Sequence, residues 1–178
     1  MRVVAGSVRG FNLIVPSGKN TRPTTNRIKE TLFNILQWDI AGCRFLDLFS
    51  GSGGIAIEAL SRGAKEAVMV EKDREAVRCI KQNVQHTKMD DRSRVMPMDV
   101  MQALRRLEQA GQPFDIIFMD PPYRLVLPKK VLEALKDTCL ADEETLIIVE
   151  EALDVDFSWA GALGYEIVKS KEYKTNKH

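Results

Sequence analysis

The sequence predicts an α/β protein of the doubly wound, Rossmann-like type, with helices on both faces of a mostly parallel sheet. Two observations predict this class. From about residue 44 onward, short apolar runs alternate with helical patterns, as expected for buried parallel strands joined by helical crossovers. A glycine-rich segment, residues 50–54, follows the first apolar run. In such folds, ligands bind at the carboxyl ends of the strands.

Short apolar segments indicate five strands, and helical periodicity fills the intervals between them. Two of the four intervening helices are closed by glycines, Gly63 and Gly111. Pro128 opens the fourth helix, at a position where an N–H has no intrahelical partner. No apolar run follows residues 165–167, so we expect the last strand of this architecture to be absent from the chain. The expected strands are Phe45–Phe49, Ala67–Val70, Val95–Met98, Ile116–Met119 and Leu146–Val149.

Residues 1–40 are expected to form an extension before the main domain, residues 41–178. Residues 2–5 and 8–15 indicate a β-hairpin of two short strands. A loop punctuated by proline and glycine spans residues 16–23, after which Thr24 or Thr25 can cap a helix. The apolar residues of that helix recur at helical spacing and leave polar residues on another face. The apolar set is Ile28, Leu32, Ile35 and Leu36, and the polar set is Arg27, Lys29 and Asn34.

The composition is that of an ordinary globular protein and disfavours several classes. The chain of 178 residues is 44% hydrophobic and 29% charged, a balance that suits one well-packed core. It has no apolar run near the ~20 residues that span a bilayer, and its start lacks the apolar core of a signal peptide, so we expect a cytoplasmic protein without membrane contact. The three cysteines and two histidines are scattered, which predicts free thiols and no metal site. We expect a monomer.

Charge is distributed unevenly along the chain. Residues 1–44 hold seven Lys and Arg against two acids, a net charge of +5, whereas residues 45–178 carry −4. Lysine and arginine displace counterions from nucleic acid, so the basic first part suggests an arm that meets phosphates. A solvated surface with chance clustering of charge would look the same.

The glycine-rich loop predicts a site for a nucleoside-bearing cofactor. Gly51 and Gly53 can take backbone angles denied to other residues, and amides at the start of the next helix would face the ligand. Their spacing also fits the dinucleotide fingerprint, so the glycines alone do not choose the cofactor. Asp47 favours S-adenosylmethionine, because a carboxylate there suits the methionine ammonium and would repel a pyrophosphate. Phe49 and Ser52 belong to the same expected contact surface.

Two further acids follow the second and third expected strands. Glu71 would accept hydrogen bonds from both ribose hydroxyls, the role of a carboxylate at this strand end in nucleoside-binding folds. Asp99 would accept from the adenine amine, while Val100 or Met98 covers the ring. Asp99 could instead simply cap the helix that follows, as Asp73 is expected to do.

The tetrapeptide Asp120-Pro121-Pro122-Tyr123 is the sharpest signal in the sequence. Its prolines fix a stiff turn at the carboxyl end of the fourth strand. An exocyclic amine on a base is a poor nucleophile because its lone pair is delocalised into the ring. Asp120 and the carbonyl of Pro121 can accept its protons and reorient the nitrogen, and Tyr123 offers a face for stacking. The motif predicts methylation of a base amine, although a stiff loop with a capping aspartate would share its residues.

Five blocks of the sequence carry a closer resemblance: residues 1–6, 21–36, 46–54, 58–64 and 120–123. They resemble the RsmD-like bacterial methyltransferases, which place a methyl group on the N2 amine of a guanine in 16S ribosomal RNA. The second block is the specific one, since the tetrapeptide and the glycine loop also occur in amino-methyltransferases of DNA. Residues 172–176 resemble the turn before the family's final strand, the strand that we expect to be absent.

The resemblance implies a class I S-adenosylmethionine-dependent methyltransferase fold with an N-terminal hairpin and helix extension. It implies that Arg22 and Thr24 belong to a loop that closes over cofactor and base. It also implies a folded substrate, the small ribosomal subunit or an assembly intermediate, and a basic arm that grips RNA. The RNA-contacting residues would be Arg2, Arg9, Lys19, Arg22, Arg27 and Lys29.

Three other functions stay open on the sequence. A DNA adenine-N6 or cytosine-N4 methyltransferase would use the same tetrapeptide on a flipped base, although it normally needs more chain to read sequence. A nicotinamide-dependent dehydrogenase could use Gly51 and Gly53, but no plausible catalytic base follows the sheet. A non-catalytic RNA-binding module would not bind S-adenosylmethionine.

Overall fold

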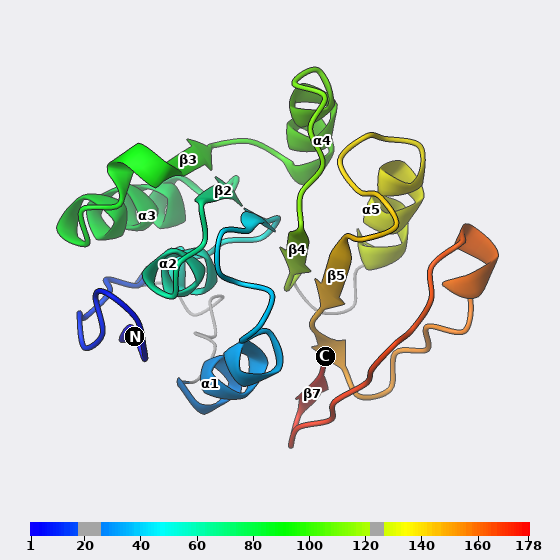
Figure 1. Cartoon of the computed structure of the whole chain (residues 1–178), viewed down its shortest axis with the longest axis horizontal. Coiled ribbons are helices and arrows are strands. Elements are labelled where there is room, and N and C mark those ends of the chain that lie inside the picture. The colour runs from blue at the N-terminus through cyan, green and yellow to red at the C-terminus, as the bar shows by residue number, and fades with distance from the viewer. Residues whose placement is uncertain (18–25, 122–126) are drawn as a thin grey trace.

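A parallel sheet of five strands forms the centre of the computed structural model, which describes residues 1–17, 26–121 and 127–178 (Figure 1). The strand order is β3-β2-β1-β4-β5. Successive strands are therefore added on one side of β1 as far as β3, and on its other side from β4 onward. This change of side, between β1 and β4, is the switch point at which doubly wound folds bind ligands. The strands are β1 (Arg44–Asp47), β2 (Glu66–Val70), β3 (Ser93–Met96), β4 (Ile116–Met119) and β5 (Leu146–Val149).

The predicted fold class is confirmed, and the strand that differs most from prediction is β3. It runs two residues earlier than the predicted Val95–Met98. As an edge strand it pairs only with β2 in the main sheet, so it tolerates the exposed Arg94. The apolar Met98 is already in the following turn, where its N–H bonds back to the carbonyl of Met96.

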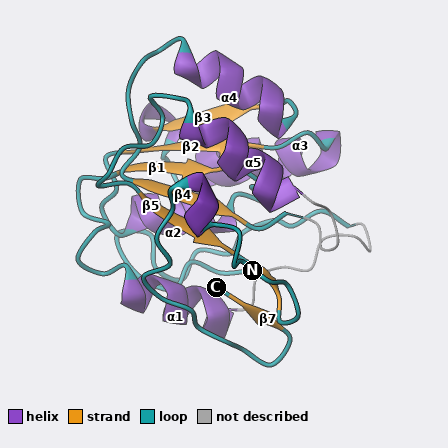
Figure 2. Cartoon of the chain, turned by 90° about the vertical axis from the view of Figure 1, so that its right-hand side faces the viewer, coloured by secondary structure: helices purple, strands orange, loops and turns teal. Residues whose placement is uncertain are grey.

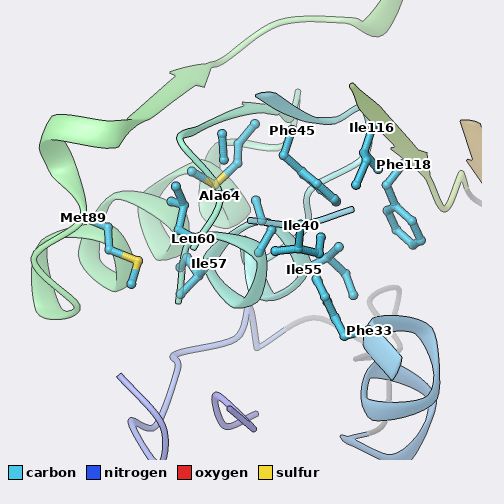
Figure 3. Close-up of a cluster of buried hydrophobic side chains, with 14 of the residues drawn as sticks. Phe33, Ile40, Phe45, Ile55, Ile57, Leu60, Ala64, Met89, Ile116 and Phe118 are labelled. Atoms are coloured by element: carbon cyan, nitrogen blue, oxygen red, sulfur yellow. The ribbon is translucent and has the colours of Figure 1, made fainter. Parts of the chain in front are cut away.

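Helices cover both faces of the sheet (Figure 2). Alternate strand residues face opposite sides, so Phe45 packs with the side chains of α1, α2 and α3, while Leu46 packs with those of α4 and α5. Figure 3 shows part of the first cluster, to which α1 contributes Phe33, α2 contributes Ile57, and β1 and β4 contribute Phe45 and Phe118. The helices are α1 (Asn26–Ile35), α2 (Gly54–Ser61), α3 (Arg74–His86), α4 (Val100–Glu108) and α5 (Leu127–Lys136).

The N-terminal extension differs from the predicted pair of regular strands. A single antiparallel bridge joins Arg2 to Asn12, supported by the Val3 N–H to Phe11 carbonyl bond of 3.0 Å. The predicted strands 2–5 and 8–15 do not form a regular ladder, because several backbone N–H groups of this segment donate to Glu58 and Ser61 of α2 instead of to the opposite strand. The Ser7 N–H, for example, donates to the carbonyl of Ser61 at 2.8 Å. Val3 and Leu13 nevertheless share the buried core with the sheet.

The C-terminal segment returns to the carboxyl edge of the sheet. A two-stranded antiparallel ribbon pairs β6 (Glu151–Ala152) with β7 (Asn176–Lys177), directly beyond β5 (Figure 1). In the described ranges, β5 is the last strand of the main sheet on this side. None of the helices in those ranges has the length and apolarity to cross a membrane.

Candidate cofactor and base site

A cavity of about 700 Å³ lies at the carboxyl edge of the sheet, around the switch point between β1 and β4. The Leu48 N–H donates to the carbonyl of Phe118 at 3.0 Å, which holds the segments leaving these strands side by side. The structure thereby brings the glycine loop and the start of the proline tetrapeptide to one cavity. The predicted residues that line it are Asp47, Phe49, Gly51, Ser52, Glu71, Asp99, Val100, Asp120 and Pro121.

Asp47 is a buried carboxyl group with few polar partners. Its side chain is 1% exposed and accepts a long hydrogen bond of 3.3 Å from the Phe49 N–H. Burial raises the pKa of Asp47 to about 7, and the nearby Glu71 adds to the rise. A cation placed in the cavity would favour the ionised form. This environment suits a ligand with an ammonium or sulfonium group.

Glu71 connects the end of β2 to the glycine loop. One carboxylate oxygen accepts the Gly51 N–H at 2.9 Å, and the other accepts the Asp73 N–H at 2.8 Å. Gly51 takes a φ of +52°, in the left-handed region that favours glycine. The predicted acid therefore shapes the loop as well as lining the cavity, and its remaining lone pairs are available to two hydroxyls.

Two predicted cofactor residues have evident structural roles. Gly53 does not line the cavity: it precedes α2 with a φ of +80°, and a Cβ at this position would lie 3.2 Å from the Met69 sulfur. Its contribution is to turn the loop into the helix. Asp99 caps α4 by accepting the Met101 N–H at 2.9 Å, the capping role left open by the sequence, and it also lies on the cavity wall.

Asp120 lies where β4 ends, in a strongly acidic surrounding. Burial raises its pKa to about 8, with further contributions from Glu150, Asp47 and Glu151. The carboxyl group is therefore poised between neutral and ionised forms near physiological pH, as acid and base groups of active sites often are. Pro121 is buried beside it. Pro122 and Tyr123 lie outside the described residues.

Sequence reasoning missed Glu150, which directly follows β5 and lines the same cavity. Its carboxylate is bound by Asn176 and by the His178 ring, whose Nε2 lies 2.9 Å away. The signal was available, because an acid stands at or just beyond the carboxyl end of each of the five strands: Asp47, Glu71, Asp99, Asp120 and Glu150.

The predicted RNA arm divides into exposed and buried residues. Arg2, Arg9 and Arg27 are exposed, whereas Lys29 is completely buried. The Nζ of Lys29 lies 3.0 Å from Glu58 and donates to the Arg2 carbonyl at 2.6 Å. The prediction that Lys29 contacts RNA is wrong, since its ammonium group is used inside the fold. Lys19, Arg22 and Thr24 lie outside the described residues.

The sheet order, the glycine loop and the acidic cavity define the class of the chain: the fold is that of the S-adenosylmethionine-dependent methyltransferases. A solved methyltransferase of this kind from Agrobacterium tumefaciens superposes with a TM-score of 0.62 over 81% of the chain and 50% of its own, at 19% identity. The chain belongs to the family described as Conserved hypothetical protein 95, whose model matches residues 1–177.

Relatives from two bacteria agree with this assignment. The Ribosomal RNA small subunit methyltransferase D of Escherichia coli K12 is 38% identical over 154 residues, covering 86% of this chain and 76% of its own. A solved hypothetical protein from Thermus thermophilus is 32% identical, with a TM-score of 0.83, and the match covers 99% of this chain and 96% of the other.

Proposed function

We propose that the protein transfers a methyl group from S-adenosylmethionine to the N2 amine of a guanine in 16S ribosomal RNA. The observation that carries the proposal is the meeting of Asp120 with Asp47 and Glu71 in one cavity at the switch point. The similarity to a Ribosomal RNA small subunit methyltransferase D supports the choice of substrate. An enzyme of ribosomal RNA would act in the cytoplasm, and we expect it to be a monomer.

The residues that line the cavity fit the proposed cofactor. Asp47, buried and with a raised pKa, would gain its charge beside the methionine ammonium. Glu71 would accept hydrogen bonds from the ribose hydroxyls. Asp99 and Val100 would contact the adenine, and Phe49 and Ser52 would form the adjoining surface of the cofactor site. When bound, S-adenosylmethionine supplies an electrophilic methyl group on a sulfonium sulfur. No group of three His, Cys, Asp or Glu in the described ranges is arranged to hold a metal ion.

Asp120 acts on the amine that receives the methyl group. Its carboxylate would accept one N–H of the amine, and the carbonyl of Pro121 would accept the other, so that the nitrogen moves toward tetrahedral geometry and its lone pair is less delocalised into the ring. Formation of the N–C bond would accompany cleavage of the sulfonium S–CH3 bond, whose electron pair would stay on sulfur as a neutral thioether, and the nitrogen would give up one proton toward Asp120 and then solvent. Holding donor and acceptor in line supplies much of the acceleration, and Tyr123 would stack on the base.

The substrate would be gripped by the basic extension. Arg2, Arg9 and Arg27 are exposed, and with Lys19 and Arg22 they would contact phosphates. The backbone around Arg2 is fixed to α2, because Glu58 accepts the Val4 and Ala5 N–H groups at 2.8 and 2.9 Å. A rigid arm beside the cavity would orient a folded RNA, as the small subunit or an assembly intermediate provides.

Transfer of tritium from labelled S-adenosylmethionine tests this function. The acceptors are free small-subunit RNA, 30S subunits and DNA, and the product is digested to nucleosides. We expect label in N2-methylguanosine from RNA or subunits, and none from DNA. Label in N6-methyladenine or N4-methylcytosine would instead identify a DNA enzyme, and failure to bind S-adenosylmethionine by calorimetry would exclude an enzyme of this class.

A further inference from the structure

Glu150 and Asp120 occupy equivalent positions on neighbouring strands. Met119 and Val149 are partners in the parallel register, and the Glu150 N–H donates to the Met119 carbonyl at 2.8 Å. The two acids therefore follow their strands side by side, about 5 Å apart along the hydrogen-bonding direction. Both line the cavity. A base that presents its amine to Asp120 has Glu150 within reach of the adjoining atom of its ring.

The side chains around Glu150 hold its carboxylate in place. Asn176 donates its amide N–H to one oxygen, and His178 donates from Nε2 to the other at 2.9 Å, because a carboxylate can only accept. Each carboxylate oxygen has two lone pairs and can accept more than one hydrogen bond. With its nitrogen turned to Glu150, Asn176 leaves its Oδ1 buried and without a hydrogen-bond partner in the described structure. This side of the cavity thus presents two neighbouring acceptors, Asp120 and Glu150.

An acceptor-rich wall discriminates between bases. Guanine carries donors at N2 and at the neighbouring N1, so its edge is complementary to two adjacent acceptors. Adenine carries an amine at C6 beside an unprotonated N1, and cytosine carries an amine at C4 beside an unprotonated N3. Each of these would point a ring lone pair at a carboxylate. Leaving buried polar groups unpaired is the strongest means by which a site rejects a wrong substrate.

We propose that Glu150 is a specificity-determining residue that accepts the N1–H of the target guanine while Asp120 accepts an N2–H. Asn176 and His178 position its carboxylate. This inference rests on the proposed function, and it gives a physical reason why the shared tetrapeptide would act on guanine in this chain.

The test compares guanosine with 2-aminopurine riboside at the RNA position that the tritium assay maps. 2-Aminopurine keeps the 2-amine but has an unprotonated N1. The wild-type protein should prefer guanosine by kcat/KM, and Glu150→Gln should reduce that preference roughly 5- to 150-fold, because an amide can donate to the bare N1. The oxygen that 2-aminopurine also lacks affects both proteins alike and cancels in this comparison. Glu150→Asp, which keeps the carboxylate, should retain the preference at a lower rate.

Glu144→Gln is the matched control, since it makes the same change at an exposed side chain that does not line the cavity. It should leave the preference unchanged. S-adenosylmethionine affinity by calorimetry verifies that each variant is folded. An equal loss on both substrates in Glu150→Gln, total loss included, would overturn the specificity role while leaving the proposed function intact. A wild-type product other than N2-methylguanosine would overturn both.

Discussion

Lys29 and Glu58 form an ion pair of 3.0 Å whose two side chains are wholly shielded from solvent. Burial lowers the pKa of Lys29 more than the neighbouring Glu58 raises it, so the ammonium is costly to desolvate. The cost is offset by sharing, because Glu58 also accepts the Val4 and Ala5 N–H groups and pairs with Arg62 at 2.9 Å. One carboxylate therefore joins the N-terminal extension, α1 and α2 beside the cofactor cavity.

Substitution of Lys29 distinguishes a role in folding from a role in RNA binding. Lys29→Met should lower the free energy of unfolding by about 1–3 kcal/mol, because Glu58 and the Arg2 carbonyl lose a buried donor while Glu58 keeps its ion pair with Arg62. Arg27→Met is the control, since Arg27 is two residues away and exposed. It should unfold like the wild type in urea but bind RNA more weakly, with a shallower salt dependence. Weaker RNA binding with unchanged stability in Lys29→Met would instead assign Lys29 to the RNA-contacting surface.

Close packing of the extension on α2 makes Gly6 sensitive to substitution. A Cβ at Gly6 would lie 1.9 Å from the Ser61 carbonyl oxygen, and the residue has a φ of +86°. Gly10 has a similar φ of +90° but open space around it. Gly10→Ala should therefore cost only the roughly 1–2 kcal/mol of left-handed backbone strain, and Gly6→Ala clearly more, as measured by thermal unfolding. Equal losses would argue against tight docking of the extension.

The sequence predicted the fold and most of the cavity wall because those features are local. An apolar run makes a strand, and an acid just after it reaches the ligand edge whatever the tertiary detail. The role of Lys29, in contrast, depends on its contact with Glu58, which is distant in the sequence. The buried stripe of α1 is Lys29, Leu32 and Phe33, continued by Leu36 just after the helix, not the predicted set with Ile28 and Ile35. A cation within that stripe, and Glu58 within an otherwise apolar helix, were the signals of the pair.

The acid after β5 placed Glu150 at the ligand edge, but its position beside Asp120 depends on sheet order. In the observed order β3-β2-β1-β4-β5, β5 lies next to β4. The partners that hold Glu150 come from residues 176–178, far along the chain. Neither contact follows from periodicity or spacing. Several predicted residues fall in the segments 18–25 and 122–126, outside the described residues, and their roles stay predictions.

Glu71→Gln should weaken cofactor binding through two effects. The amide cannot accept with both ends, so it loses either the Gly51 N–H or the Asp73 N–H, and it loses charge toward the ribose hydroxyls. We expect the Kd for S-adenosylmethionine to rise roughly 10- to 100-fold in calorimetry, from hydrogen bonds to a charged group. Glu66→Gln, at the opposite end of the same strand, should bind like the wild type. Unchanged affinity in Glu71→Gln would remove Glu71 from the cofactor site.

The raised pKa of Asp120 predicts opposite pH trends for activity and stability. Its folded pKa of about 8 exceeds the ordinary 3.8, so the folded state binds more protons than the unfolded state between these values, and this group makes stability fall as pH rises across that window. Activity should rise over the upper part of the window, because only the carboxylate accepts from the amine. Methyl transfer measured from pH 6 to 9.5 should therefore increase through about pH 8.

Substitution of Asp120 tests whether the rise of activity near pH 8 comes from this carboxyl group or from another group in the chain. Asp120→Asn should lose most activity and the rising limb of the profile. It should also unfold at higher urea than the wild type at pH 8, because the neutral amide removes a buried charge that is costly at that pH. The exposed Asp137→Asn should change neither curve. An activity profile for Asp120→Asn that still rises near pH 8 would assign the titration to another group.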